Sequence, residues 1–250
     1  YYEINGYLDN IRITKGEALY TKNFDVYKFN GTINSDSYLF NGSTDYFEIP
    51  TNIAPQLAGS DFTIEFWAKI SSDPTTTAVI YLQGPWTASG SMLSIYYNTS
   101  LDNLYLDFYA RYCAVNISAY YDIWTHYAFT YLESGTTNDS NTAKIYINGL
   151  IAGTDNISDL TYYTIGGANI ANGHTASGKV EIGRRFPEND LYSKGELKHL
   201  RVWNDVRTGN EIRNAISNNA PNLDHYNMYS LYHENLLLYM PMNSTDKNVY

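Results

Sequence analysis

The chain has 250 residues and a formal net charge of −10, a balance that argues against a nucleic-acid-binding surface. Aromatic residues make up 16% of the chain, 26 of them tyrosines, so it can bury a sizeable core and is not intrinsically disordered. No apolar run approaches the roughly 18 residues of a membrane span, which excludes membrane insertion. The length suits one large all-β domain.

The two ends of the chain resemble each other. Residues 6–14 and 195–203 share the pattern Gly-x-Leu-x-x-apolar-Arg-apolar, and residues 29–32 are weakly echoed by 242–245. Because the chain also begins on Tyr1, we expect a segment of a tandem array. Residues 1–26 would be the exit strand of a preceding repeat or an added edge strand, 27–217 a β-sandwich, and 218–250 a packed connector with a strand at 236–243. The alternative is that the N-terminal strand completes this domain's own sheet.

Between the ends, apolar and polar residues alternate as in half-buried strands. Residues 62–70 place five apolar side chains on one face and Thr63, Glu65, Trp67 and Lys69 on the other. Residues 101–112, 124–131 and 143–147 read as further strands, the last ending at Asn148-Gly149, a strong hairpin signal. Only residues 209–217 have helical spacing. The pattern predicts a two-sheet antiparallel β-sandwich with one short helix.

Six segments, taken in order, resemble a known family. They are YLFNGSTDYFEIP (38–50), DFTIEFWAK (61–69), WTHYA (124–128), IYING (145–149), VEIGR (180–184) and residues 195–203. This order resembles the LamG-like jelly roll of the concanavalin A-like lectin/glucanase superfamily over about 27–217, and residues 11–24 resemble the exit strand of such domains in large virion proteins. The resemblance implies an adhesion or carbohydrate-binding module, located outside cells or on virus surfaces.

Catalysis finds little support in the sequence. Glycoside hydrolysis needs two carboxylates held about 5 Å or 6.5–9.5 Å apart, and the hydrolase branch of the superfamily carries a Glu-x-Asp-x-Glu stretch that this chain lacks. Glu65 and Glu181 are each the only acid in their strand, and Asp102 and Asp107 would face opposite sides of an unbroken strand. No nucleophile triad, phosphate loop or His/Cys metal spacing appears. We therefore expect no catalytic residues, with a glycoside hydrolase as the remote alternative.

Carbohydrate binding needs aromatic faces for the CH surfaces of sugars. Trp86 lies in a loop, and three tyrosine pairs each place one ring in the core and one outside if they lie in strands. The stacking candidates are Trp86, Tyr97, Tyr121 and Tyr163. Trp67 would line a groove or lie under a loop. Trp124 and Trp203 fall within strand motifs and are expected in the core.

Related jelly rolls often bind calcium through loop carboxylates, and the matching loops here offer Asp45, Glu188, Asn189 and Asp190. The neighbouring Arg184 and Arg185 would weaken such a site. No cofactor is therefore required, and Ca²⁺ stays an open alternative.

Cys113 is the only cysteine, so no intrachain disulfide can form, and its apolar surroundings predict a buried thiol. Glycosylation sequons begin at Asn30, Asn41, Asn98, Asn116, Asn138, Asn156 and Asn243, which permits an extracellular glycoprotein.

Taken together, the sequence favours a non-catalytic extracellular, cell-surface or virion-surface module for adhesion or structural assembly. The alternative is a lectin-like carbohydrate-binding module. The expected partners are like subunits or neighbouring repeats, with glycans as the alternative, and neither nucleic acid nor membrane.

Overall fold

The structure is a computed structural model that describes residues 28–30, 32–34, 37–52, 54–73, 77–84, 92–109, 112–133, 142–156, 178–218 and 235–240. The strands are β1 (Lys28–Asn30), β2 (Thr32–Asn34), β3 (Ser37–Asn41), β4 (Tyr46–Ile49), β5 (Phe62–Ile70), β6 (Ala78–Gln83), β7 (Leu93–Asn98), β8 (Asn103–Asp107), β9 (Tyr112–Asn116), β10 (Thr125–Leu132), β11 (Thr142–Ile147), β12 (Leu150–Asn156), β13 (Val180–Ile182), β14 (Lys194–Trp203) and β15 (Leu236–Met240). The helices are the 3₁₀ helix η1 (Ser118–Tyr120) and α1 (Gly209–Asn218).

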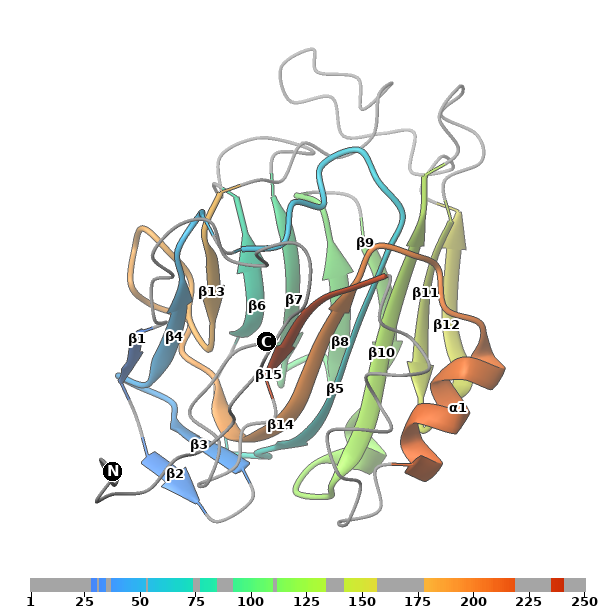
Figure 1. The fold of residues 1–250 in the computed structure, drawn as a ribbon. Coiled ribbons are helices and arrows are strands. Elements are labelled where there is room, and N and C mark those ends of the chain that lie inside the picture. Colours follow the sequence, from blue (N-terminus) through green and yellow to red (C-terminus); the bar gives the residue numbers. More distant parts are fainter. Residues whose placement is uncertain are drawn as a thin grey trace, which may run out of the picture.

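Two antiparallel sheets pack face to face (Figure 1). The smaller sheet has the strand order β1-β4-β13-β6-β7-β8-β9. The larger sheet has the order β12-β11-β10-β5-β14-β3-β2, with β15 paired to β14. The predicted all-β sandwich is confirmed.

Aromatic side chains fill the space between the sheets. The Tyr38 ring on β3 lies 4.5 Å from that of Phe47 on β4, and the Phe108 ring lies 4.9 Å from that of Tyr131 on β10, measured between centroids. Each pair joins one sheet to the other. Because aromatic side chains bury the largest apolar areas, part of the high tyrosine content is core material.

The predicted solvent face of β5 is wrong at two positions, since Thr63 and Glu65 are fully buried. The chain that follows β14 folds back over this face. The Thr63 hydroxyl donates to the carbonyl of Asp205 at 2.6 Å and accepts from the backbone N–H of Arg207 at 2.9 Å. Alternation along one strand cannot predict this burial, because the residues that bury Thr63 and Glu65 lie about 140 positions later in the chain.

Beneath that cover lies a buried ionic cluster. Glu65 accepts a hydrogen bond from the indole N–H of Trp203 at 3.1 Å, and its carboxylate lies 3.6 Å from Arg201 and 4.0 Å from Arg207. His126 is also fully buried, 3.6 Å from the second oxygen of Glu65. Burial, together with the charges of Arg201 and Arg207, lowers the pKa of His126 to about 3. The histidine is therefore neutral, and Glu65 is the acid that lies nearest both arginine charges.

Helix α1, predicted at 209–217, lies against the outer side of the larger sheet (Figure 1). Thr208 and Glu211 form a capping box, in which the Thr208 N–H donates to the Glu211 carboxylate at 2.7 Å and the Glu211 N–H donates to the Thr208 hydroxyl at 3.3 Å. Ile212 and Ile216 pack on Tyr146 of β11. The helix thus closes the outer face beside β10.

The Asn148-Gly149 hairpin is confirmed. It joins β11 to β12 with positive φ at both residues, 50° and 77°, as a two-residue type I′ turn requires.

The single strand predicted at 101–112 is wrong. The chain instead forms β8 and β9, with Tyr109 in the left-handed region at φ 61° in the turn between them. The sequence does not predict this turn, because the turn contains neither glycine nor proline.

The strand predicted at 236–243 is observed over residues 236–240 as β15, and residues 241–243 lie outside the described residues. This strand pairs with residues 200–203 of β14, whereas residues 194–197 of β14 pair with β3. Leu238, Tyr239 and Met240 are buried, whereas Leu237 is 37% exposed.

Cys113 is buried, as predicted. The expected exit strand at 1–26 and the connector from 219 to 234 lie outside the described residues. In the part of the chain described, no helix has the length and apolar character needed to cross a membrane.

Candidate functional site

The outer face of the smaller sheet carries tyrosines and asparagines on β7, β8 and β9. Tyr96 pairs with Tyr105, and Asn103 pairs with both Asn98 and Asn116. Alternate residues of a strand share a face, and the intervening residues of these strands face the core. We call this surface the tyrosine platform, comprising Tyr96, Tyr105, Tyr112, Asn98, Asn103 and Asn116.

The three rings fix one another. Tyr96 and Tyr105 are stacked, with centroids 4.6 Å apart, and Tyr112 meets Tyr105 edge to face at 5.3 Å. Such contacts stabilise by about 0.5–1.5 kcal/mol each beyond area burial. Tyr105 is only 7% exposed, whereas Tyr112 is 42% exposed. Tyr112 is therefore the ring that can take a ligand, and the other two hold it.

The asparagines form a polar row beside the rings. The Asn103 side-chain amide donates to the Tyr105 hydroxyl at 3.3 Å, and that of Asn98 donates to Thr77 at 3.2 Å. The side-chain amide oxygen of Asn116 accepts a hydrogen bond from the Ser118 hydroxyl at 2.7 Å. Asn116 is exposed, and no described residue accepts from its side-chain NH₂ group. Amides of this kind can bind sugar hydroxyls, because they offer both donors and acceptors.

A carboxylate lies at one end of the platform. Asp107 is cross-strand neighbour to Ser94 and Tyr112 and is 5% exposed. Burial, and secondarily the negative charge of Asp107, raises the pKa of Tyr96. Tyr96 therefore stays a neutral phenol, able to donate a hydrogen bond, and the platform has a negative character.

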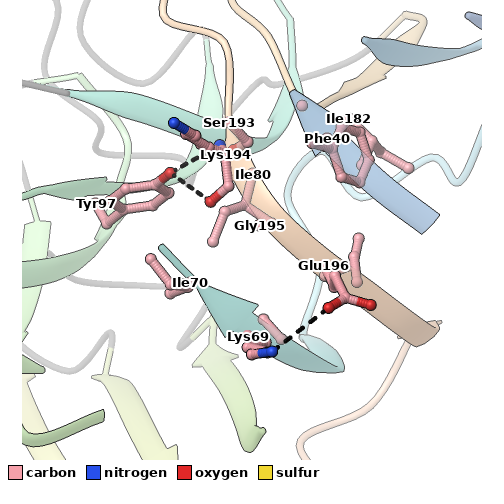
Figure 2. Close-up of a pocket in the computed structure, with 13 residues that line it drawn as sticks. Phe40, Lys69, Ile70, Ile80, Tyr97, Ile182, Ser193, Lys194, Gly195 and Glu196 are labelled. Carbon is pink, nitrogen blue, oxygen red and sulfur yellow. Dashed lines mark hydrogen bonds and ion pairs between the residues drawn. The ribbon is translucent and has the colours of Figure 1, made fainter. Parts of the chain in front are cut away.

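Tyr97 was predicted as a stacking residue, and this is wrong. Its side chain is 1% exposed and lies between the sheets, where its hydroxyl accepts from the Lys194 N–H at 3.0 Å and donates to the Lys194 carbonyl at 3.2 Å (Figure 2). Burial raises the pKa of Tyr97 to about 12. Its neighbour Tyr96 is the outward member of the pair. Alternation shows that neighbours point apart, but not which of them points inward.

Figure 2 also shows a cavity between the sheets, lined by Phe40, Ile70, Ile80 and Tyr97 among others. Its volume is about 20 Å³, room for about one water molecule. A sugar ring does not fit there.

The alternation rule does not apply to Tyr120-Tyr121, because Tyr120 ends η1 and Tyr121 follows it rather than lying in a strand. Both are half-buried and pack against the core. Tyr121, a predicted stacking residue, is not on the platform, and burial raises its pKa to about 12.

Of the tryptophans, Trp203 is buried as predicted, but Trp124 is only half-buried. Trp124 immediately precedes β10, and the Lys198 ammonium lies 4.3 Å from its ring centroid. Trp67 is half-buried and packs edge to face on His126 at 5.5 Å.

The calcium candidates do not converge on one cation. Both carboxylate oxygens of Asp45 accept hydrogen bonds from Asn41, in their own turn. Asp190 is held by Arg185 through two bonds of 2.8 and 2.6 Å, and Glu188 lies 3.7 Å from the same guanidinium. Asn189 is exposed beside them. Among the residues the structure describes, no three His, Cys, Asp or Glu are grouped for a metal. The arrangement does not fit a calcium site.

Three sequon asparagines have described side chains. The side-chain amide oxygen of Asn41 accepts hydrogen bonds from the backbone N–H groups of Ser43 and Thr44 in the same turn. Asn98 and Asn116 belong to the tyrosine platform. The other candidates fall outside the described residues, or have side chains that are not described there: Asn30, Asn138, Asn156, Asn243, Trp86 and Tyr163.

Glu65, Glu181 and Asp107 do not face one another. Glu65 is buried on the larger sheet, and Glu181 lies on the smaller sheet 2.8 Å from Arg184. The acid that faces Glu181 is Glu48 of β4, and the Lys179 ammonium lies between them, 2.6 Å from Glu181 and 2.9 Å from Glu48. Asp107 has Ser94 and Tyr112, not an acid, as its cross-strand neighbours. No pair among these three forms the facing carboxylates that the reaction needs.

Residues 41–213 match the family model described as the concanavalin A-like lectin/glucanases superfamily. The chain belongs to this superfamily. The resemblance in the sequence is thereby confirmed. No curated protein sequence matches the chain.

Three solved structures of the same fold have descriptions that mention binding or interaction with another molecule. A Bacteroides ovatus protein provisionally described as carbohydrate-binding aligns with a TM-score of 0.55 and 17% identity, over 86% of this chain and 53% of its own. A structure of botulinum neurotoxin type C aligns with a TM-score of 0.55 and 14% identity, over 76% of this chain and 46% of its own. Cell entry of that toxin is described as dependent on interaction with two ganglioside molecules. The receptor-binding domain of botulinum neurotoxin D aligns with a TM-score of 0.51 and 15% identity, over 78% of this chain and 46% of its own. The chain spans about half of each.

The sequence did not single out Tyr105 or Tyr112, and it pointed to Asp107 only as an acid to be tested for catalysis. A signal was present in residues 103–107, where Leu104 and Leu106 alternate with the outward residues. It was hidden because 101–112 reads as one continuous strand.

Proposed function

We propose that the chain is a non-catalytic carbohydrate-binding module and that the tyrosine platform is its binding surface. The observation that carries the proposal is the exposed Tyr112 ring, held by the Tyr96–Tyr105 stack beside the row of asparagine amides. An aromatic face covers the CH surface of a sugar ring, and neighbouring amides bind its hydroxyls. Rings already fixed in place lose little entropy on binding.

The ligand class is a neutral saccharide. Asp107 at the end of the platform and the net charge of −10 both oppose an anionic ligand.

The comparisons support binding rather than catalysis, because the aligned proteins are described as receptor-binding or carbohydrate-binding. We infer an extracellular or surface setting, in keeping with the sequons. Binding needs no cofactor, so chelation with EDTA should leave it unchanged.

A glycan array tests the proposal. The wild-type chain should bind at least one neutral oligosaccharide, Tyr112→Ala should lose that signal, and Tyr112→Phe should keep most of it because the ring remains. Trp86→Ala, in the same experiment, tests the loop tryptophan singled out in the sequence. An array with no neutral hit, or a hit that Tyr112→Ala leaves intact, would reject the platform as the site.

Assembly with like subunits is the second candidate function. The edge strand β12 exposes two large apolar side chains, Leu150 at 65% and Ile151 at 59%. An exposed apolar edge can pair with another copy. Light scattering at rising concentration should then show a dimer that Ile151→Lys dissolves, and a monomer at every concentration would remove this candidate.

A further inference from the structure

A second group of aromatic side chains lies on the other side of the sandwich, on the outer face of the larger sheet. Trp67 belongs to β5 and pairs in register with Lys198 of β14 on one side and His126 of β10 on the other. Trp124 stands one residue before β10. The strand order β10-β5-β14 therefore brings both indoles and the lysine together. We call Trp67, Trp124 and Lys198 the indole patch.

Lys198 reaches across the sheet. It starts on β14, passes β5 and ends with its ammonium 4.3 Å from the centroid of Trp124. The Trp67 ring is supported by the fully buried His126 ring at 5.5 Å. All three residues of the patch are half-buried, so part of each is open to solvent.

Lys198 differs from the neighbouring lysines in the partner of its ammonium group. Lys194, on the same strand, pairs with Asp73, and Lys69, on β5, pairs with Glu196 at 3.7 Å. For Lys198, the described ranges contain no carboxylate within ion-pair distance, and its partner is an indole face. Such a cation prefers a carboxylate when one is offered, because a charge-assisted hydrogen bond is stronger than contact with an exposed ring.

Trp67 adds a second unmet interaction. Its indole N–H is buried and donates to no described residue. Buried donors are normally paired, and this one has no partner among the described residues.

We propose that the indole patch is a second carbohydrate site, selective for sugars that bear a carboxylate, such as sialic or uronic acids. The ligand carboxylate pairs with Lys198, and the indoles take the CH face of the sugar ring. The ligand chemistry is opposite to that of the tyrosine platform, which lies on the other sheet and beside Asp107. The inference does not depend on the platform binding sugar.

Isothermal titration of the full chain with 3′-sialyllactose, trigalacturonate and uncharged lactose tests the site. At least one acidic sugar should bind more tightly than lactose, and Lys198→Met, which keeps the apolar stem, should weaken that binding at least tenfold. Lys194→Met removes a lysine that already has an acid partner and should leave the affinity unchanged.

Trp124→Phe serves as a second variant with small risk to folding, and it should weaken acidic-sugar binding several-fold. The proposal is overturned if neither acidic sugar binds at millimolar concentration, or if Lys198→Met and wild type bind equally. Loss of binding in Tyr112→Ala instead would place the acidic sugar on the platform and equally overturn it. Failure of the tyrosine platform as a binding site is a different result, because it appears as the absence of binding to neutral glycans.

Discussion

Tyr96 and Tyr105 lie face to face across β7 and β8, with ring centroids 4.6 Å apart and planes inclined by only 11°. This stack leaves Tyr105 no room to turn, and the edge of the stack sets the position of Tyr112. A surface ring in most proteins samples several rotamers, and ordering it costs binding free energy. Here the ordering is part of folding.

Removing the middle ring should therefore cost stability. Tyr105→Ala deletes a ring that is 7% exposed and packed on both sides, so we expect a loss of about 2–4 kcal/mol of unfolding free energy. Tyr105→Phe loses only the hydrogen bond from Asn103 and should cost about 1 kcal/mol or less. Urea denaturation measures both, and equal losses for the two variants would contradict the role given to the ring.

Glu65 should be costly to neutralise. Glu65→Gln leaves the buried Arg201 and Arg207 without their counter-charge, and breaking a buried pair typically costs about 3–5 kcal/mol. Lys69→Met, which breaks the surface pair with Glu196, should cost about 1 kcal/mol or less. A Glu65→Gln variant as stable as Lys69→Met would show that the cluster contributes nothing.

His126 makes stability depend on pH. Its pKa falls from 6.5 to about 3 on folding, so below pH 6.5 the unfolded chain takes up a proton that the folded chain refuses. Stability is therefore lost as the pH falls from about 6.5 towards 3, at about 1.4 kcal/mol per pH unit from this residue. His126→Gln lacks this proton uptake.

Denaturation curves at pH 7, 6, 5 and 4 check the histidine. Relative to wild type, His126→Gln should gain stability at each lower pH, whereas Tyr112→Phe, which changes no group titrating in this range, should keep a constant difference. Parallel pH profiles for wild type and His126→Gln would mean that folding does not lower the pKa of His126.

Gly195 permits β14 to pass close to β5. It has φ +134°, and an added Cβ would overlap the carbonyl oxygen of Lys69. Gly59 has φ +64° with open space around it. Gly195→Ala should cost about 2–5 kcal/mol and Gly59→Ala about 1–2 kcal/mol, since only the first adds a clash to the backbone strain. Thermal unfolding measures the difference, and a smaller loss at Gly195 would contradict the close approach.

The strands were predictable where local pattern decides them. The nine residues of β5 and the Asn148-Gly149 hairpin are set by side-chain alternation and by a turn that only certain residues form. Tyr109 shows the limit, since it turns the chain in a conformation that its residue type does not signal. Alternation also gave the opposite orientation of Tyr96 and Tyr97 without showing which one faces the core.

The site was harder to predict because it depends on register between strands. Asn98, Asn103 and Asn116 lie in one row only because β7, β8 and β9 pair as they do. The burial of Glu65 likewise depends on a segment far along the chain. Neither relationship leaves a periodic trace in the sequence.

The central claim is that a neutral sugar binds on the tyrosine platform. The most direct measurement is an NMR titration of the ¹⁵N-labelled chain with the neutral oligosaccharide that binds best on the array. We predict shift changes concentrated in β7, β8 and β9, and a dissociation constant at least tenfold higher for Tyr112→Ala. Shift changes confined to other parts of the chain, with an unchanged dissociation constant in Tyr112→Ala, would contradict it.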